Sequence, residues 1–143
     1  MTLRSAISTS LPALAAIGAL AFAMPATAGS ETTRADRGQE RLDKLLKDRI
    51  AGEPTNCVFN RPSGRLYIID ETALVYESGS TVYVNYTKHP ESLDDGDYLV
   101  LNNPGTQLCR TTQITTRRRG GNFFSGVVFL DDFIPYKKVK DEG

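Results

Sequence analysis

The stretch from Ala73 to Tyr86 most constrains the fold of this chain, because its pattern predicts a β-hairpin. Aromatic and β-branched residues flank Ser78-Gly79, which we expect to form the two-residue turn, since glycine adopts positive φ without a Cβ clash. This turn places Val75 opposite Val82. Cross-strand pairs of this kind each stabilise a sheet by roughly 0.2–1 kcal/mol. The rest of the chain is therefore expected to assemble around an antiparallel sheet.

The first 28 residues have the pattern of a secretory signal peptide. Arg4 is the only charge before an apolar run from Leu11 to Met24, and Ala26-Thr27-Ala28 is a small-residue cleavage site. We expect cleavage after Ala28 and a periplasmic or secreted location. The apolar run is too short to span a bilayer, and no later segment is apolar enough to do so. A retained membrane anchor is the alternative.

The mature chain is short and nearly neutral, which limits its size and its partners. Removal of residues 1–28 from the 143 leaves 115 residues, with 16 Lys and Arg against 17 Asp and Glu and a net charge of −1. This length suits one small domain. Because nucleic-acid binders usually carry a basic surplus, we expect no nucleic-acid partner.

Residues 29–52 contain the helix candidate of the chain. Its apolar residues fall at helical spacing and form one stripe: Leu42, Leu45, Leu46 and Ile50. Gly52 and Pro54 are stop signals, and the polar segment before Gly38 is expected to fray. The stripe predicts a helix that packs on the sheet, with a partner-binding helix as the alternative.

Beyond Gly52, short β-prone runs alternate with turn signals, one of which is Asn103-Pro104-Gly105. Besides the hairpin, the runs are residues 56–59, 65–70, 98–102, 108–117, 123–130 and 133–136. Because residues 123–130 are apolar on both faces, we expect a central or barrel strand there. Pro135 marks the last run as an edge strand. Residues 70–72 form either a tight turn or a bulge before the hairpin.

These elements predict an α+β fold that is mainly β. We expect a small antiparallel sheet or partly open barrel of about 6–8 strands, with one N-terminal helix packed on it. In this organisation residues 53–137 form a disulfide-linked β domain and residues 138–143 form a flexible tail.

Cys57 and Cys109 are the two cysteines of the chain, and export makes a disulfide between them the expected state. In the chain-entropy model, closing a loop of about 50 residues contributes about 4 kcal/mol. Two free thiols are the first alternative. A metal or redox site is the second, although neither zinc-ligand spacing nor a C-x-x-C pair is present.

The sequence contains no recognisable catalytic arrangement. His89 is the only histidine, and it precedes a proline in a polar loop, which is a poor position for a general base. The same loop carries four carboxylates: Glu91, Asp94, Asp95 and Asp97. Calcium binding and glycosidase chemistry are the alternatives for these carboxylates, but a solvated turn fits the spacing better. We therefore predict no catalytic residue, metal or cofactor.

Arg117-Arg118-Arg119 is the sharpest charge feature. Three guanidinium groups near a hairpin end are suited to bind phosphate or carboxylate groups of an anionic envelope lipid or an acidic partner. The alternative is that they protect a sheet edge from aggregation. The six tyrosines are expected to lie half-buried in the sheet, with an exposed binding face as the alternative.

Several short motifs resemble a family of small exported bacterial proteins known only as a domain of unknown function. They are Gly52-Glu53-Pro54, residues 69–76, Tyr83-Val84-Asn85, Leu108-Cys109-Arg110 and Phe133-Ile134-Pro135-Tyr136. The resemblance covers about residues 50–138 and implies an envelope location, but no activity, substrate or catalytic residue. Where relatives carry a lipid-attachment cysteine after the signal, this chain has none.

These observations predict a non-enzymatic binding or structural module of the cell envelope. Its partner is expected to be an envelope protein or an anionic envelope component. A periplasmic enzyme inhibitor is one alternative, by analogy of scaffold alone. A small-ligand carrier is another, if helix and sheet enclose a cavity. A hydrolase that uses the acidic loop with Arg117–Arg119 ranks last.

Overall fold

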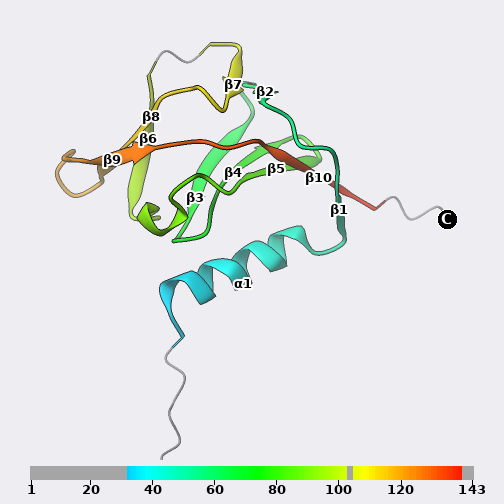
Figure 1. Ribbon diagram of the computed structural model, residues 1–143, viewed down its shortest axis with the longest axis horizontal. Coiled ribbons are helices and arrows are strands. Elements are labelled where there is room, and N and C mark those ends of the chain that lie inside the picture. The colour runs from blue at the N-terminus through cyan, green and yellow to red at the C-terminus, as the bar shows by residue number, and fades with distance from the viewer. Residues whose placement is uncertain (1–31, 103–104, 140–143) are drawn as a thin grey trace, which may run out of the picture. The chain divides into compact units, whose positions relative to one another are not determined.

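The computed structural model describes residues 32–102 and 105–139. The predicted signal peptide, the turn at Asn103-Pro104 and residues 140–143 of the predicted tail lie outside the described residues. Within the described residues one α-helix accompanies three antiparallel sheets (Figure 1). The predicted class, α+β and mainly β, is therefore confirmed, and none of the sheets closes into a barrel.

The elements are, in chain order, α1 (Arg34–Leu46), β1 (Arg49–Ala51), β2 (Cys57–Phe59), β3 (Arg65–Ile69), β4 (Ala73–Ser78), β5 (Thr81–Asn85), the short 3-10 helix η1 (Pro90–Ser92), β6 (Asp97–Leu101), β7 (Gln107–Cys109), β8 (Ile114–Arg118), β9 (Phe124–Val128) and β10 (Ile134–Lys138). The largest sheet has the strand order β1-β10-β5-β4-β3. A second sheet pairs β2 with β7, and a third has the order β6-β8-β9.

The β4–β5 hairpin forms, but its register differs from the predicted one. Ser78 pairs with Thr81, so the turn residues are Gly79 and Ser80, and Val75 lies opposite Val84 rather than Val82. Gly79 has the expected positive φ of 60°. Because side chains alternate with a period of two, this two-residue shift leaves every side chain on its predicted face.

The helix is shorter than the predicted span 29–52. Thr33 caps it, since its side chain accepts a hydrogen bond from the Asp36 amide, and the Asp36 carboxylate accepts one from the Thr33 amide at 2.9 Å. This capping box starts the helix before Gly38, where fraying was expected. At the other end, Asp48 has a φ of 60° and ends the helical path. Ile50 then lies in strand β1 with 63% of its surface exposed, outside the helical stripe.

Two apolar clusters lie on opposite faces of the five-stranded sheet. The cluster under the helix contains Leu42, Ile69, Ala73, Val75, Val82 and Val84. The cluster on the other face joins this sheet to the two smaller ones and contains Val58, Ile68, Leu74, Tyr76, Leu93, Leu108, Ile114, Val128, Leu130 and Phe133. Successive residues of β4 therefore pack on opposite faces of the sheet: Ala73 and Val75 lie under the helix, and Leu74 and Tyr76 lie in the other cluster.

The segment before the hairpin is a turn. The Thr72 amide donates to the Ile69 carbonyl at 3.1 Å, and Glu71 has a φ of 46°, which tightens the chain reversal between β3 and β4. The helix approaches this turn closely at Gly38, where a Cβ atom would lie 2.1 Å from Thr72 Oγ1. Only glycine fits there, and this contact places the start of α1 beside the turn.

The prediction that Pro135 marks an edge strand is wrong. β10 lies inside the five-stranded sheet, between β1 and β5. The Pro135 carbonyl accepts a hydrogen bond from the Gly52 amide at 2.7 Å, just beyond the last residue of β1. The missing proline donor therefore falls at the end of the β1–β10 ladder, where it costs only one terminal hydrogen bond.

The prediction for residues 123–130 is also wrong, because β9 is an edge strand of the three-stranded sheet. Residues 108–117, predicted as one β-prone run, divide between β7 and β8. The tyrosines are mostly half-buried as expected, and Tyr76 is almost fully buried at 1% exposure. Tyr86 is the exposed member, at 39%.

Candidate functional site

The predicted disulfide is confirmed. Cys57 and Cys109 are direct cross-strand partners in β2 and β7, with their Cα atoms 4.0 Å apart and their Sγ atoms bonded. The crosslink joins positions 52 residues apart and holds the two-stranded sheet together. Such a bond fits an oxidising environment outside the cytoplasm.

The three arginines lie at the β8–β9 hairpin, but the structure gives each a different setting. Arg117 pairs with Phe124 across a bulge in the ladder, and its guanidinium donates to the Asn122 carbonyl at 3.3 Å. Arg118 is the exposed last residue of β8, whereas Arg119 lines a groove described below. Arg117 and Arg118 therefore lie near the tip of the hairpin, whereas Arg119 belongs to the lining of the groove.

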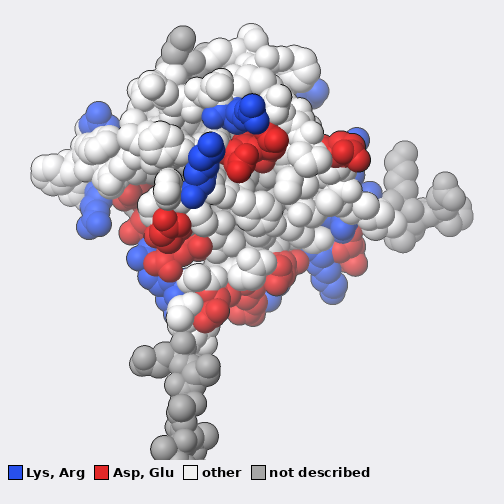
Figure 2. All heavy atoms as spheres, viewed as in Figure 1, with Lys and Arg blue, Asp and Glu red and all other residues white. Residues whose placement is uncertain are grey.

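Phenylalanine side chains are exposed along the same hairpin. Phe123 is 73% exposed, Phe124 62% and Phe129 56%, and Val127 between them is 41% exposed. Figure 2 shows the end of this hairpin as an uncharged protrusion with basic side chains on both sides. Large apolar groups that gather in one exposed place usually mark an interaction surface.

Sequence reasoning missed this surface because it expected the run 123–130 to be buried. A signal was present in Ser125 and Gly126, two poor core residues within the run. Ser125 is the extra residue of the β8–β9 bulge, and its hydroxyl donates to the buried carboxylate of Asp97 and lies 3.1 Å from Thr116 Oγ1. The bulge re-aims the strand and leaves its phenylalanines toward solvent.

A groove of about 790 Å³ lies between β3 and β6. Its lining combines an apolar set with charged residues: Arg41, Gly64, Arg65, Leu66, Tyr67, Ile68, Glu77, Asp95, Asp97, Tyr98, Leu99, Leu101 and Arg119. Several of the charged side chains in the lining already have ion-pair or hydrogen-bond partners. Arg41 lies 3.5 Å from Asp95, and the Tyr67 hydroxyl donates to Glu77 at 2.7 Å, which together with burial raises the pKa of Tyr67.

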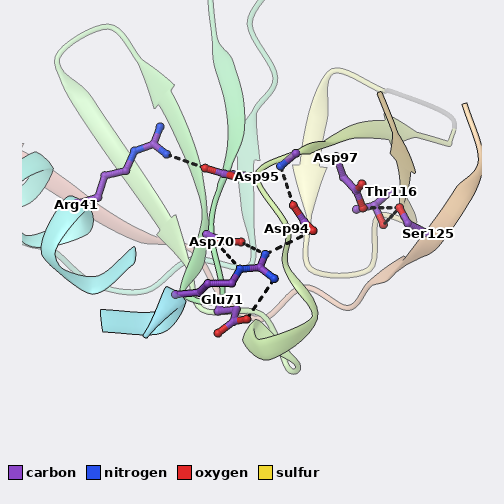
Figure 3. Close-up of polar contacts among 10 residues, drawn as sticks. Arg41, Asp70, Glu71, Asp94, Asp95, Asp97, Thr116 and Ser125 are labelled. Atoms are coloured by element: carbon purple, nitrogen blue, oxygen red, sulfur yellow. Dashed lines mark hydrogen bonds and ion pairs between the residues drawn. The ribbon is translucent and has the colours of Figure 1, made fainter. Parts of the chain in front are cut away.

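The acidic loop does not act as one group. The Arg34 guanidinium forms two hydrogen bonds to Asp70, of 2.7 and 2.5 Å, and lies 3.4 Å from Asp94 and 3.5 Å from Glu71. Figure 3 shows these three carboxylates gathered at one place, while Asp97 lies apart with Thr116 and Ser125. The hydrogen bond from Arg34 lowers the pKa of Asp70, so this carboxylate is charged at neutral pH.

Carboxylate oxygens of Asp70, Asp94 and Asp95 lie within 4.8 Å of one another, a spacing that a cation could bridge. The Arg34 guanidinium already supplies positive charge to two of them. His89 is also peripheral: its exposed ring lies 3.2 Å from Glu91, its loop neighbour. The geometry therefore assigns these side chains to local ion pairs.

Comparisons with models of protein families, with curated proteins and with solved structures find no match to this chain. The resemblance to the exported family of unknown function stays a prediction from the motifs alone. Among residues 32–102 and 105–139, no helix has the length and apolar character needed to cross a membrane. The function must therefore be argued from the surfaces of the protein itself.

Proposed function

We propose that the mature chain is an exported, non-enzymatic binding module that docks on the anionic surface of the cell envelope through the β8–β9 hairpin. The observation that carries this proposal is the coincidence of exposed phenylalanines with Arg117 and Arg118 on one protruding hairpin. The disulfide supports export, because such bonds persist mainly in oxidising compartments.

The chemistry of the hairpin suits a lipid interface. Aromatic rings partition to the level of the headgroups, where apolar surface leaves water without crossing the bilayer. Arginine binds phosphate through two parallel hydrogen bonds, and each basic side chain near an anionic surface contributes about 1 kcal/mol. Phe123 and Phe124 supply the first contribution, and Arg117 and Arg118 supply the second. Such a contact is reversible and weakens with salt.

The ion pairs and hydrogen bonds of the acidic residues favour a binding protein over a hydrolase. A hydrolase built on the acidic loop needs a carboxylate free to act as acid or base. Asp94 lies 3.4 Å from Arg34, and Asp97 accepts a hydrogen bond from Ser125. An enzyme inhibitor and a small-ligand carrier remain the alternatives, and the groove between β3 and β6 is where a carrier would hold its ligand.

Vesicle sedimentation tests the proposal. We expect the mature protein to sediment with vesicles of phosphatidylcholine and phosphatidylglycerol in equal parts, and to stay in solution with phosphatidylcholine alone. Replacing Phe123 and Phe124 by Ser, or Arg117 and Arg118 by Gln, is expected to lower partitioning by about tenfold. Phe59→Ser is the matched control, because Phe59 is 67% exposed but lies on β2.

Two results would contradict the proposal. The first is equal binding of the hairpin variants and the wild type to anionic vesicles. The second is a stable dimer in sedimentation equilibrium that dissociates when Phe123 and Phe124 are replaced, since the hairpin would then serve self-association. Capture of the hairpin by an acidic protein without vesicle binding would favour a protein partner instead.

A further inference from the structure

A second pocket, of about 350 Å³, lies where β9 ends. Three segments form its walls: Lys88 from the loop after β5, residues 110–113 between β7 and β8, and residues 127–130 at the end of β9. Among these lining residues, all of them described, Lys88 and Arg110 are cations and none carries a carboxylate. The charge of the lining therefore favours an anionic occupant.

Both cations of the pocket can accept an anion. The side chain of Lys88 is exposed, and within the described ranges 32–102 and 105–139 it forms no ion pair. Arg110 is half-exposed, and its Nη1 atom lies 3.4 Å from Oδ1 of Asp132. Because a guanidinium carries five N–H donors, this single contact leaves most of the donors of Arg110 available.

Main-chain hydrogen bonds hold the two cations in place. The Lys88 amide donates to the Phe129 carbonyl at 2.9 Å, which joins the loop after β5 to the end of β9. The Arg110 amide donates to the Asn56 carbonyl at 2.9 Å, next to the disulfide of Cys109. The backbone on both sides of the pocket is therefore fixed before a ligand arrives, which lowers the entropic cost of binding.

A row of exposed apolar side chains connects this pocket to the tip of the β8–β9 hairpin. Arg117 lies opposite Phe124, and Thr115, two residues earlier on the same face of β8, lies opposite Val127. Because directly opposed residues share a face of a sheet, the bulge places Phe124 and Val127 on one face. Phe129 is two residues beyond Val127 and continues the row into the lining of the pocket.

We propose that this pocket binds the phosphate of one anionic phospholipid molecule, whose acyl chains lie along the apolar row toward the hairpin tip. The inference rests on the docking proposed above and gives it a headgroup site. Arg110 donates hydrogen bonds to the phosphate oxygens, and Lys88 contributes a second positive charge. Val127 and Phe129 contact the first carbons of the acyl chains, and this apolar contact distinguishes a lipid from a free phosphate.

Titration with a soluble short-chain lipid tests this proposal on the mature protein without a bilayer. The probe is dihexanoylphosphatidylglycerol, kept below the concentration at which it forms micelles, and the readout is the amide chemical shifts in NMR spectra. We expect saturable shifts at Lys88, Arg110, Gln113 and Phe129, which line the pocket, and none at Phe59. Inorganic phosphate is expected to bind about tenfold more weakly, because it buries no apolar surface.

Matched variants separate the charged contact from the apolar one. Lys88→Gln and Arg110→Gln are each expected to weaken binding of the soluble lipid by about fivefold. Lys137→Gln is their control, because Lys137 is an exposed lysine of β10 outside the pocket, and it should leave the affinity unchanged. Phe129→Ser is also expected to weaken binding by about fivefold, whereas Phe59→Ser, on β2, has no effect.

An absence of saturable shifts at the pocket would overturn the proposal. Equal affinity for inorganic phosphate would overturn the apolar contact, and equal affinity for dihexanoylphosphatidylcholine would overturn the selection of an anionic lipid.

The hairpin variants Phe123→Ser and Phe124→Ser should keep their affinity for the soluble lipid. The strand from Phe124 to Phe129 spans about 16 Å, which six-carbon chains do not cover. Soluble lipid binding without vesicle sedimentation would therefore refute the hairpin docking alone. Vesicle sedimentation without soluble lipid binding would refute the pocket alone.

Discussion

The hydroxyl of Tyr76 donates a hydrogen bond to the carbonyl oxygen of Phe59 at 3.0 Å. The hydroxyl oxygen of Tyr76 also accepts a hydrogen bond from the Arg61 amide at 2.8 Å, and the Tyr76 side chain is 1% exposed. Tyr76 belongs to the five-stranded sheet, and Phe59 ends a strand of the disulfide-linked sheet. One buried hydroxyl therefore connects two of the three sheets.

Removing this hydroxyl should destabilise the domain. Tyr76→Phe leaves the Phe59 carbonyl and the Arg61 amide without this partner in a partly buried setting, which costs about 1 kcal/mol. Urea unfolding measures the difference. Tyr83→Phe is the control, because the Tyr83 ring lies 6.1 Å from that of Tyr76 in the same hairpin, and its stability effect is expected to be small. Equal losses in the two variants would show that the Tyr76 hydroxyl has no special role.

Gly64 is predicted to depend on the position of the Tyr76 ring. A Cβ atom at residue 64 would lie 2.2 Å from the Tyr76 hydroxyl oxygen and 2.5 Å from a ring carbon. Gly64→Ala should therefore cost about 1–3 kcal/mol through overpacking. Gly120→Ala is the control, since no atom lies within 4 Å of its Cβ position. In a Tyr76→Leu background the cost of Gly64→Ala should fall, and strict additivity would refute the predicted contact.

The disulfide should supply a large share of the stability. Replacing Cys57 and Cys109 by Ala reopens a loop that spans 52 positions, which costs about 4 kcal/mol in the chain-entropy model. Small domains have a total stability of about 5–15 kcal/mol. Chemical unfolding of the oxidised protein and the double variant measures this loss. A difference below about 1 kcal/mol would mean that the crosslink constrains little of the unfolded chain.

The contact between Arg34 and Asp70 should make stability depend on pH in the acid range. Arg34 lowers the pKa of Asp70 in the folded protein below that of an unfolded Asp, which is about 4. The contact therefore contributes its full share of the free energy of unfolding above about pH 4. That share is lost as the pH falls through the lowered pKa of Asp70. Asp70→Asn should lower the melting temperature by a few degrees at pH 7. The difference in melting temperature between Asp70→Asn and the wild type should disappear at acid pH, where Asp70 is protonated.

Glu53→Gln is the control for this pH series, because Glu53 is an exposed carboxylate distant in sequence from the Arg34 cluster. Its melting temperature is expected to follow that of the wild type at every pH. A constant gap between Asp70→Asn and wild type from pH 7 to pH 2 would contradict an ionic contribution from Asp70.

Local patterns in the sequence predicted most strands, because alternation and turn residues act within a few positions. The hairpin shows both the strength and the limit of such patterns. Its faces were predicted correctly although the turn moved from Ser78-Gly79 to Gly79-Ser80, since period-two alternation is insensitive to a shift of two. The helix was extended too far because Ile50 continues the helical spacing by chance inside β1.

The position of a strand within a sheet depends on distant partners, which local patterns do not encode. This explains why β9 was expected inside the fold and β10 at its edge. It also explains why the groove was not predicted: β3 and β6 become neighbours only through pairings with β4 and β8 on their other sides. The candidate residues Arg117–Arg119 were found by charge, whereas the phenylalanines beside them were assigned to the core.

A tryptophan reporter at the hairpin tip tests most directly whether this surface meets lipid. The chain has no tryptophan, so Phe123→Trp introduces the only one. We predict that its fluorescence shifts to shorter wavelength on addition of anionic vesicles and that salt reverses the shift, while Phe59→Trp stays unchanged. An emission spectrum of Phe123→Trp that is the same with and without anionic vesicles would contradict the proposed docking.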